Sequence, residues 1–175
     1  MKHIYILRHA DKNKETGQLT DTGRERAKNL KKSLGFFDLV ITSDRPRTVE
    51  TVILLTNQNP LIDERAGFTY NSDEEKNKLH ELAKDHPLSH AGAIFDDIDT
   101  FGNLAHYVGE KFIDLLQETF KKLPENGQAL IVSQDGVMVA AEQLLLHKPF
   151  QKQERYFEPL GGFIVDEGLQ VAPLD

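Results

Sequence analysis

Short apolar runs typical of β-strands alternate along this chain with longer segments of helical periodicity. This alternation is typical of α/β architecture, and we therefore expect an α/β fold. The strand-like runs cover 2–9, 38–43, a weak 60–64 and 128–133, and a closing hairpin is expected in the stretches GGFIVDE and LQVAPL.

The segments between the strands carry helix signals. Thr20 or Thr22 is a suitable N-cap for the first helix and Gly35 a suitable stop, while Pro46 falls in the first turn of the second, where its missing N–H costs nothing. The segment PLSHAGAIFDDIDTFGN (87–103) is predicted to be less regular. The expected helices lie within 19–37, 45–58, 71–86, around 103–122, and 136–148.

A length of 175 residues, with 39% hydrophobic and 28% charged residues, suits one domain with a core of its own. No internal repeat, low-complexity tract or linker divides the chain. We therefore expect a single domain over residues 1–175. Within it, residues 65–101 are interpreted as a variable insertion carried over the strand ends.

Composition excludes several classes of function. Cysteine is absent, so disulfides, thiolate nucleophiles and Cys-ligated metals are excluded, and a cytoplasmic location is expected. The net charge of −7 argues against nucleic acid or an acidic membrane as a partner. No apolar stretch approaches 18 residues, and the first residues lead straight into a strand, which leaves no room for a signal peptide. The charged helix faces favour a monomer.

Polar residues gather where three of the predicted strands end. In open α/β sheets, ligands bind beyond the carboxyl ends of the strands, so these residues are the candidates for a site. They are Arg8 and His9 after the first strand, Ser43, Arg45 and Arg47 after the second, and Ser133, Gln134 and Asp135 after the fourth.

The residue types in this set suit a phosphoryl group. Arg47 falls in the first turn of its helix, where free N–H groups and the helix dipole favour an anion. Two arginine side chains beside such a helix start predict a phosphate site, and a neutral imidazole such as His9 can attack phosphorus there. The alternative is that Arg8 and Arg47 only cap helices and pair with surface carboxylates, as most arginines do.

The motifs LRHADK, LTDTGRERA and TSDRPRTVETV occur in this order and spacing, and ALIVSQDGV follows downstream. Together they resemble the histidine phosphatase superfamily over essentially the whole chain. That superfamily includes the cofactor-dependent phosphoglycerate mutases and the small bacterial phosphohistidine phosphatases. The resemblance implies a phosphoglycerate mutase-like, three-layer α/β/α sandwich with a mostly parallel central sheet.

The resemblance also implies roles for individual residues. His9 would be the nucleophile that becomes a phosphohistidine, and Arg8 and Arg47 would hold the phosphoryl oxygens. Thr20, Ser43 and Gln134 fall at the family's other phosphate-binding positions. Glu64 is the best match to the acid that protonates the leaving oxygen. Its neighbour Asp63 is the other candidate for that role. The alternative to a catalytic role for Glu64 is a solvent-exposed ion pair with the adjacent Arg65.

Two residues depart from the family pattern where it matters most. Gln134 stands where the family has its second pocket histidine, and losing one charged donor to the transition state costs on the order of 3 kcal/mol. Asp135 beside it would repel a phosphate dianion. Arg45 would compensate in part, and the alternative is that Arg45 is simply exposed to solvent. Ala10 replaces the common Gly, and Asn103-Leu104 replaces a Glu-Ser that the mutases use, which argues against mutase activity.

His80, His86 and His90, together with Asp96, Asp97 and Asp99, raise the question of a metal site. Histidines six and four residues apart do not share one helical face in the way that metal ligands do. We therefore expect no metal and no cofactor.

Two functions follow from these observations. The first is a metal-independent phosphomonoesterase that acts through phospho-His9 on a small phosphorylated metabolite or a phosphoprotein, with turnover slowed by Gln134. The second is a catalytically impaired pseudophosphatase that binds a phosphorylated ligand or partner. The retained nucleophile favours the first function, and Gln134 favours the second.

Overall fold

The structure is a computed structural model that describes residues 1–86, 89–152 and 156–174. Pro87 and Leu88, which open the segment predicted to be less regular, lie outside the described residues, as does Asp175 at the end of the expected domain.

Six strands form one sheet within the described residues, in the order β3-β2-β4-β1-β5-β6. Strands β3, β2, β4 and β1 run parallel to one another, whereas β5 runs antiparallel to β1 and β6 antiparallel to β5. The predicted mostly parallel sheet is therefore confirmed. The strands are β1 (His3–Arg8), β2 (Leu39–Thr42), β3 (Leu61–Ile62), β4 (Gln128–Ser133), β5 (Gly162–Asp166) and β6 (Val171–Pro173).

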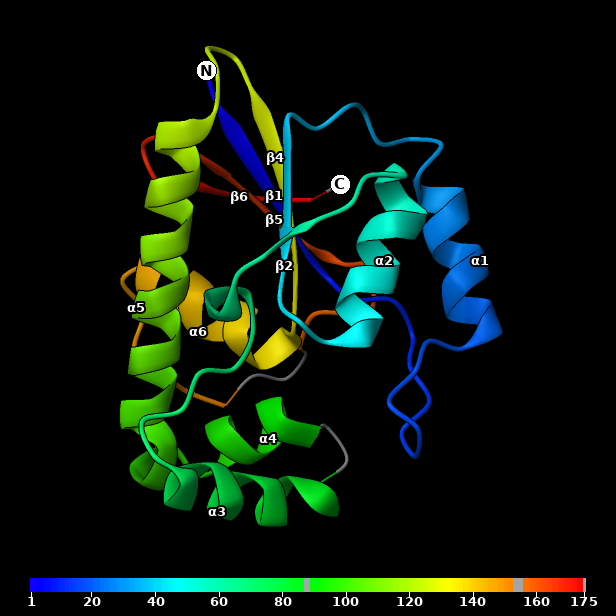
Figure 1. Ribbon diagram of the computed structural model, residues 1–175. Helices are drawn as coiled ribbons and strands as arrows, with labels where there is room; N and C mark the ends of the chain where they lie inside the picture. Colours follow the sequence, from blue (N-terminus) through cyan, green and yellow to red (C-terminus); the bar gives the residue numbers. More distant parts are fainter. Residues whose placement is uncertain (87–88, 153–155, 175) are drawn as a thin grey trace.

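Helices cover both faces of this sheet, which completes the expected α/β/α sandwich. Figure 1 shows α1 and α2 on one face and α5 and α6 on the other, with α3 and α4 near the carboxyl ends of the parallel strands. The helices are α1 (Asp21–Leu30), α2 (Pro46–Thr56), α3 (Asp73–Lys84), α4 (Ser89–Asp96), α5 (Ile98–Lys122) and α6 (Asp135–Leu145), with a short 3-10 helix, η1 (Glu64–Ala66).

Each face of the sheet buries its own hydrophobic cluster. On the α5 and α6 side, Ile4, Ile6 and Ile131 pack against the long helix. On the α1 and α2 side, Leu7 and Val132 belong to a second cluster. Alternate residues of a strand point to opposite faces, so the apolar runs of β1 and β4 contribute side chains to both cores. This packing fixes the ends of the two strands beneath the helices.

Local signals set the helix starts as predicted. The Thr20 hydroxyl accepts a hydrogen bond from the Gly23 N–H at 3.0 Å and so caps α1. Gly23 is required by packing, since a Cβ added there would lie 2.5 Å from the carbonyl oxygen of Asp11. Pro46 is the first residue of α2. The loop after β1 is thus held tightly against the start of α1.

The prediction of a less regular segment over 87–103 is wrong for most of its described part. Residues 89–96 form α4, and α5 begins at Ile98 with Asp97 as its N-cap, accepting from the Thr100 N–H at 3.3 Å. Ala93, Ile94 and Phe95 of α4 are buried in the core on the α5 side. An eight-residue helix is marginal alone, and this burial stabilises it.

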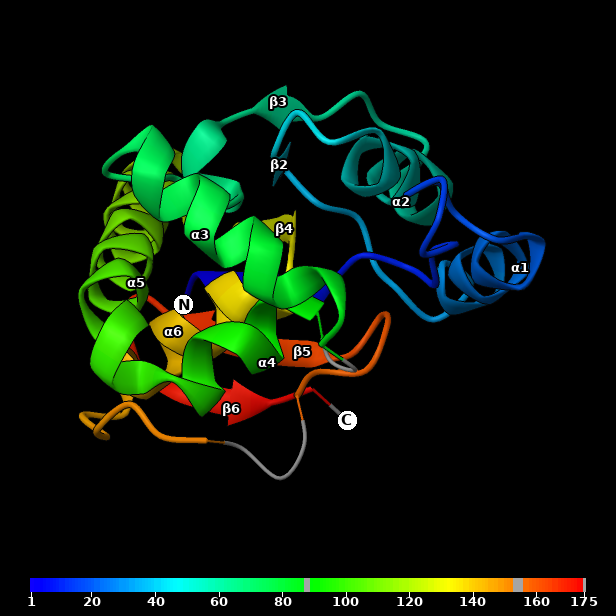
Figure 2. The same ribbon diagram turned by 90° about the horizontal axis from the view of Figure 1, so that it is seen from below.

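The position of α3 and α4 defines the surroundings of the strand ends. Seen from below, these two helices lie in front of the sheet, beside α6 and the chain that leads into β5 (Figure 2). Because the parallel strands deliver their last residues to this edge, side chains of α3 and α4 can wall any site formed there.

Candidate active site

Arg8 and His9 leave the sheet at a point held from both sides. The His9 N–H donates to the Ser133 carbonyl of β4 at 3.1 Å, and the Arg8 N–H donates to the Gly161 carbonyl before β5 at 2.9 Å. Ala10 follows, fully buried, and its N–H donates to the Thr51 hydroxyl at 3.1 Å. The backbone that carries the predicted nucleophile is therefore fixed by the sheet and by α2.

His9 is a buried imidazole with one defined hydrogen bond. Only 3% of the residue is exposed, and Nδ1 lies 2.7 Å from the carbonyl oxygen of its neighbour Ala10. A carbonyl only accepts, so Nδ1 carries the proton and Nε2 keeps its lone pair. Burial, followed by the positive charges of Arg47, Arg8 and Lys12, lowers the pKa of His9 to about 3, even though the bond to Ala10 works in the other direction. At pH 7 the ring is neutral and nucleophilic.

Arg8 is braced by two acceptors. Its Nη1 donates to the Phe157 carbonyl, and its Nη2 lies 3.3 Å from Oδ2 of Asp135. Arg8 is thus paired with a carboxylate, but that carboxylate lines the cavity and is not the surface group that the alternative required. Nε of Arg8 is buried without a partner among the described residues.

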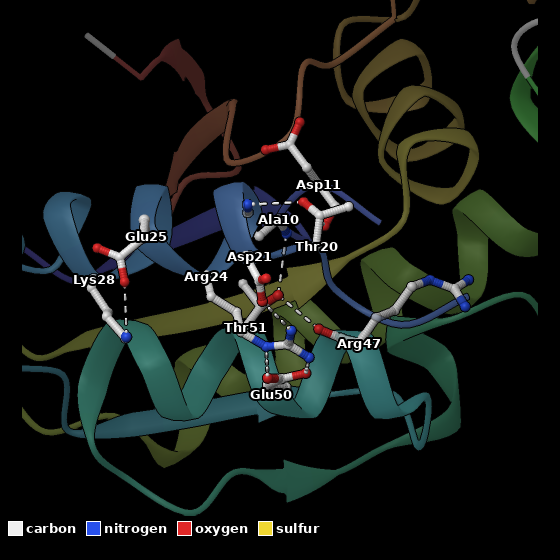
Figure 3. A network of polar contacts seen from close by, with 11 residues as sticks. Ala10, Asp11, Thr20, Asp21, Arg24, Glu25, Lys28, Arg47, Glu50 and Thr51 are labelled. Atoms are coloured by element: carbon white, nitrogen blue, oxygen red, sulfur yellow. Dashed lines mark hydrogen bonds and ion pairs between the residues drawn. The ribbon is translucent and has the colours of Figure 1, made fainter. Parts of the chain in front are cut away.

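Arg47 differs from Arg8 in having no hydrogen-bond or ion-pair partner for its guanidinium among the described residues. It lies in the first turn of α2, and its side chain is half-buried. Burial is the main cause that lowers the pKa of Arg47, joined by repulsion from Arg45 and Arg8, while Asp135 opposes the shift. In Figure 3 the guanidinium points away from the contacts around Thr51. A half-buried cation without a partner is suited to an anion.

Lys12 was not recognised as a site residue from the sequence. It is half-buried and lines the same cavity as Arg8 and His9. Burial and the charges of Arg47 and Arg8 lower its pKa, and Asp135 raises it. The signal that could have found it is its position three residues after His9, in a loop that returns over the strand end.

Gln134 and Asp135 start α6 directly after β4. Gln134, 8% exposed, is the N-cap residue, but its side chain makes no capping hydrogen bond. Oδ1 of Asp135 accepts from the Gly136 N–H at 2.9 Å, while Oδ2 faces Arg8. Asp135 thus pairs with Arg8, and its charge partly offsets the lowering of the pKa values of Lys12 and Arg47.

The other predicted site residues lie at more distant or already occupied positions. Ser43 is buried and its hydroxyl lies 3.1 Å from the Thr48 hydroxyl, while the Thr20 hydroxyl caps α1. Glu64 is exposed in η1, and neither it nor its competitor Asp63, which pairs with Arg65 at 2.7 Å, lines the cavity. The phosphate-binding roles of Ser43, Thr20 and Gln134, and the proton-donor role of Glu64, stay predictions.

A cavity of about 1100 Å³ opens above Arg8 and His9. Lys12, Lys14 and Lys84 line it as cations, and Asp11, Asp85, Asp135 and Glu158 as acids. The acid Asp11 is paired with Arg26 at 2.7 Å. The remaining walls come from α3, α4 and the chain before β5, namely His80, Ala83, His86, His90, Tyr156, Phe157 and Pro159.

The histidines weighed as metal ligands have other contacts. His86 Nε2 lies 2.9 Å from Asp96 Oδ2, and the His80 and His90 rings contact each other with centroids 5.0 Å apart. Over residues 1–86, 89–152 and 156–174, no group of three or more His, Cys, Asp or Glu side chains is placed to hold a metal ion.

A neutral histidine lines a cavity beside Arg8 at the carboxyl edge of a mostly parallel sheet, and Arg47 is near enough to lower its pKa although it does not line the cavity. This arrangement defines an α/β protein whose site is suited to a phosphoryl anion. Comparison of the sequence with family models matches the histidine phosphatase superfamily (branch 1) over residues 4–161. The chain therefore belongs to the histidine phosphatase superfamily, as its motifs predicted. The search of curated proteins gives no match.

Solved structures share the fold at low sequence identity. YhfR of Bacillus stearothermophilus has a TM-score of 0.69 at 18% identity, covering 99% of this chain and 95% of its own. A mycobacterial glucosyl-3-phosphoglycerate phosphatase complexed with VO3 has a TM-score of 0.66 at 17% identity, covering 95% and 93%. A mutant phosphoserine phosphatase of Entamoeba histolytica in complex with phosphoserine has a TM-score of 0.63 at 13% identity, covering 100% and 96%.

The solved structures, which include a phosphoglycerate mutase from Bacillus anthracis, confirm the predicted phosphoglycerate mutase-like fold. The family match supports a phosphoric monoester hydrolase. Within the described residues, the helices are all too short or too polar to cross a membrane.

Proposed function

We propose that the protein is a metal-independent phosphomonoesterase that works through a phosphohistidine on His9. The observation that carries this proposal is a neutral, buried imidazole near the guanidinium of Arg47, which has no partner among the described residues. Arg8, Arg47 and Lys12 supply the positive charge that a phosphoryl group requires. We further propose that residues 1–175 form one domain, in which the segment 65–101 walls the cavity.

The reaction takes place in two displacements. In the first, Nε2 of His9 forms a bond to phosphorus while the bond from phosphorus to the leaving oxygen breaks, and that oxygen takes up a proton. In the second, a water oxygen attacks phosphorus while its proton passes to the donor that was deprotonated in the first step. The bond from phosphorus to Nε2 then breaks, and inorganic phosphate leaves. The hydrogen bond from Nδ1 to Ala10 keeps the reactive nitrogen facing the substrate throughout. Glu64 remains the predicted proton donor.

The substrate is a small phosphorylated metabolite or a phosphoprotein. The solved neighbours include complexes with phosphoserine and with 3-phosphoglyceric acid, which are ligands of those proteins. For this chain, the cavity of about 1100 Å³ is large enough for either class of substrate.

A second candidate function is supported by the contact between Asp135 and Arg8. A carboxylate that already pairs with Arg8, next to a glutamine in place of a cationic histidine, weakens the electrostatic stabilisation that turnover requires. In this alternative the protein is a pseudophosphatase that binds a phosphorylated ligand without efficient hydrolysis.

Hydrolysis of p-nitrophenyl phosphate in the presence of EDTA tests the first function. The wild type should release nitrophenol, and His9→Ala should abolish the release while still binding phosphate. Activity that survives in His9→Ala would contradict the mechanism.

Gln134→His separates the two functions. Because a charged donor in this position is worth on the order of a hundredfold in rate, this variant should raise kcat by roughly tenfold or more if Gln134 limits turnover. Gln134→Asn, which keeps the amide, is the matched control. An unchanged rate in Gln134→His would mean that Gln134 does not limit catalysis.

A further inference from the structure

Four flat side chains form a closed cluster beside the cavity. The Phe68 and Tyr70 rings stack with centroids 6.1 Å apart, and the His80 and His90 rings meet edge-to-face at 5.0 Å. Phe68 contacts His90 at 5.7 Å, and Tyr70 contacts His80 at 5.8 Å. We call Phe68, Tyr70, His80 and His90 the ring cluster. It joins the chain after η1 to α3 and α4.

The ring cluster is continuous with the candidate active site. A Cβ added at Gly136 would lie 2.6 Å from Cζ of Phe68, so this ring lies directly on the first turn of α6, next to Gln134 and Asp135. His80 and His90 line the cavity that has Arg8 and His9 at its floor. The cluster therefore links the start of α6 to the outer part of the same cavity.

Flat side chains also come from a separate segment of the chain. Tyr156, Phe157 and Pro159, which precede β5, line the same cavity. They are held by packing, since the Tyr156 ring lies 6.1 Å from Phe95 and the Phe157 ring 5.5 Å from Phe163. These residues reach the cavity from the chain before β5, whereas His80 and His90 reach it from α3 and α4.

The two histidines present uncharged rings near neutral pH. Burial is the largest cause that lowers the pKa of His90, to about 4, with further lowering by His80, Lys12, Arg47 and Arg45. Burial also lowers the pKa of His80, followed by Lys76 and Arg45. The lysines of the cavity, by contrast, lie on the loop after β1 and at the end of α3. The part of the wall formed by the ring cluster therefore favours a neutral, planar group.

We propose that the cavity face of the ring cluster, formed by His80 and His90, is the subsite for the leaving group, and that it selects aryl phosphate monoesters. This inference rests on the proposed function, because it places the phosphoryl group at Arg8 and His9. From that position, the group attached to the ester oxygen extends outward into the cavity. An aryl leaving group there would contact the imidazole rings of His80 and His90 in the offset or edge-on geometry that aromatic pairs prefer. The shared chemistry is an aryl phosphate, either a small molecule or a phosphotyrosyl side chain.

Non-hydrolysable ligands test this subsite without the influence of leaving-group reactivity. The dissociation constants of inorganic phosphate, methylphosphonate and phenylphosphonate are measured by calorimetry on the full chain. Phenylphosphonate should bind about tenfold more tightly than methylphosphonate to the wild type. His80→Ala should remove most of this preference, and His80→Phe, which restores a ring, should recover it.

The matched control is His106→Ala, which changes an exposed histidine of α5 outside this cavity and should keep the wild-type preference. His80 is itself exposed at the residue level, so its replacement should leave phosphate binding unchanged. Equal affinities for the phenyl and methyl ligands in the wild type, with phosphate still bound, would overturn the aryl subsite alone. Failure to bind phosphate would overturn the proposed function instead.

A peptide that carries phosphonomethyl-phenylalanine, the stable analogue of phosphotyrosine, distinguishes the sources of the aryl group. Tighter binding of this peptide than of phenylphosphonate, with the same loss in His80→Ala, supports the subsite and assigns a protein substrate. Weaker binding of the peptide beside tight phenylphosphonate binding supports the subsite and assigns a small aryl phosphate.

Discussion

His9 shows how its surroundings determine what one side chain can do. An exposed histidine is partly protonated near pH 6.5, but burial and three cations keep the His9 ring neutral. Its Nδ1 donates a hydrogen bond to the Ala10 carbonyl. The same cations would attract a phosphoryl group toward Nε2. In the proposed mechanism, Arg8, Lys12 and Arg47 therefore add to the effect of burial in keeping the nucleophile neutral, and they also attract its target.

Asp135 opposes this arrangement, which leads to a prediction for a single residue. In Asp135→Asn, the ion pair with Arg8 is lost and a negative charge is removed from among three cations. Inorganic phosphate should then bind roughly tenfold more tightly, since a charged hydrogen-bond partner of this kind is worth about 1.5–3 kcal/mol and Asn retains part of it. Competition with inorganic phosphate in the phosphatase assay, or calorimetry, measures the change.

The control for this prediction is Asp85→Asn, which removes the same charge from another wall of the cavity. It should change phosphate affinity much less, because no ion pair with Arg8 is lost. Equal effects of the two substitutions would show that only the net charge of the cavity matters, and that the contact between Asp135 and Arg8 does not compete with phosphate.

At the scale of elements, the site depends on how α2 is joined to the end of β1. The Thr51 hydroxyl accepts from the Ala10 N–H at 3.1 Å and donates to the Arg47 carbonyl at 2.7 Å (Figure 3). An ion pair of 2.6 Å between Arg24 and Glu50 joins α1 to α2 nearby. Ala10, which follows the proposed nucleophile, and Arg47, which we propose to bind the phosphoryl group, are therefore tied to one hydroxyl.

Thr51→Val tests this connection. The substitution keeps the shape of the side chain but leaves the buried Ala10 N–H without its acceptor, which should lower the free energy of unfolding by about 1–3 kcal/mol. It should also lower kcat more than it raises KM, because His9 and Arg47 lose their common support. Urea unfolding and steady-state kinetics measure the two effects.

Thr56→Val is the matched control on the same helix, because its hydroxyl also donates to a carbonyl four residues earlier but is not bonded to the β1 loop. It should leave kcat near the wild-type value. If Thr51→Val lost stability with unchanged kinetics, Thr51 would be structural only and would not position the site.

The sequence allowed prediction of those elements whose signals are local. β1 and β4 show as apolar runs that end in polar residues, and Thr20 and Pro46 mark helix starts, so the strand ends and the positions of Arg8 and His9 followed from pattern alone. The helix α4 did not, because its stability comes from burial of Ala93, Ile94 and Phe95. The ring cluster was missed for the same reason, because it depends on the packing of α3 and α4. Lys12 was missed although its place in the loop after His9 is a local signal.

At the scale of the whole molecule, the sheet separates two cores and leaves its carboxyl edge for polar groups. The buried residues of β1, β2 and β4 face both helical layers. Charged side chains line the cavity at this edge, and residues of α3 and α4 form part of its wall. Figure 2 shows the two helices in front of the sheet. Because His9 and His90 are neutral in the folded protein, the free energy of unfolding of the whole molecule depends on pH.

Stability should consequently fall on the acid side of neutrality. His9 and His90 have pKa values lowered to about 3 and about 4, whereas histidines of the unfolded chain titrate near 6.5. Between these values the unfolded chain binds protons that the folded chain does not, so the free energy of unfolding decreases as the pH falls from 6.5 toward 4. Each group contributes about 1.4 kcal/mol per pH unit within that window.

Urea unfolding of the wild type and of His9→Asn at a series of pH values from 4 to 7 measures this dependence. The variant should show a slope smaller by about 1.4 kcal/mol per pH unit below pH 6, because one of the two groups is removed. Parallel curves for the two proteins would contradict the burial of a neutral imidazole at His9.

Direct detection of the phosphoryl-enzyme tests the central claim, that His9 takes the phosphoryl group between Arg8 and Arg47. The protein is mixed with an excess of p-nitrophenyl phosphate, quenched in alkali to preserve phosphohistidine, and analysed by mass spectrometry of the intact chain and of its peptides. We predict a gain of one phosphoryl group on the peptide that contains His9 in the wild type and no gain in His9→Ala. Hydrolysis of the substrate together with a phosphoryl group on another residue, or with the same labelling in His9→Ala, would contradict the account.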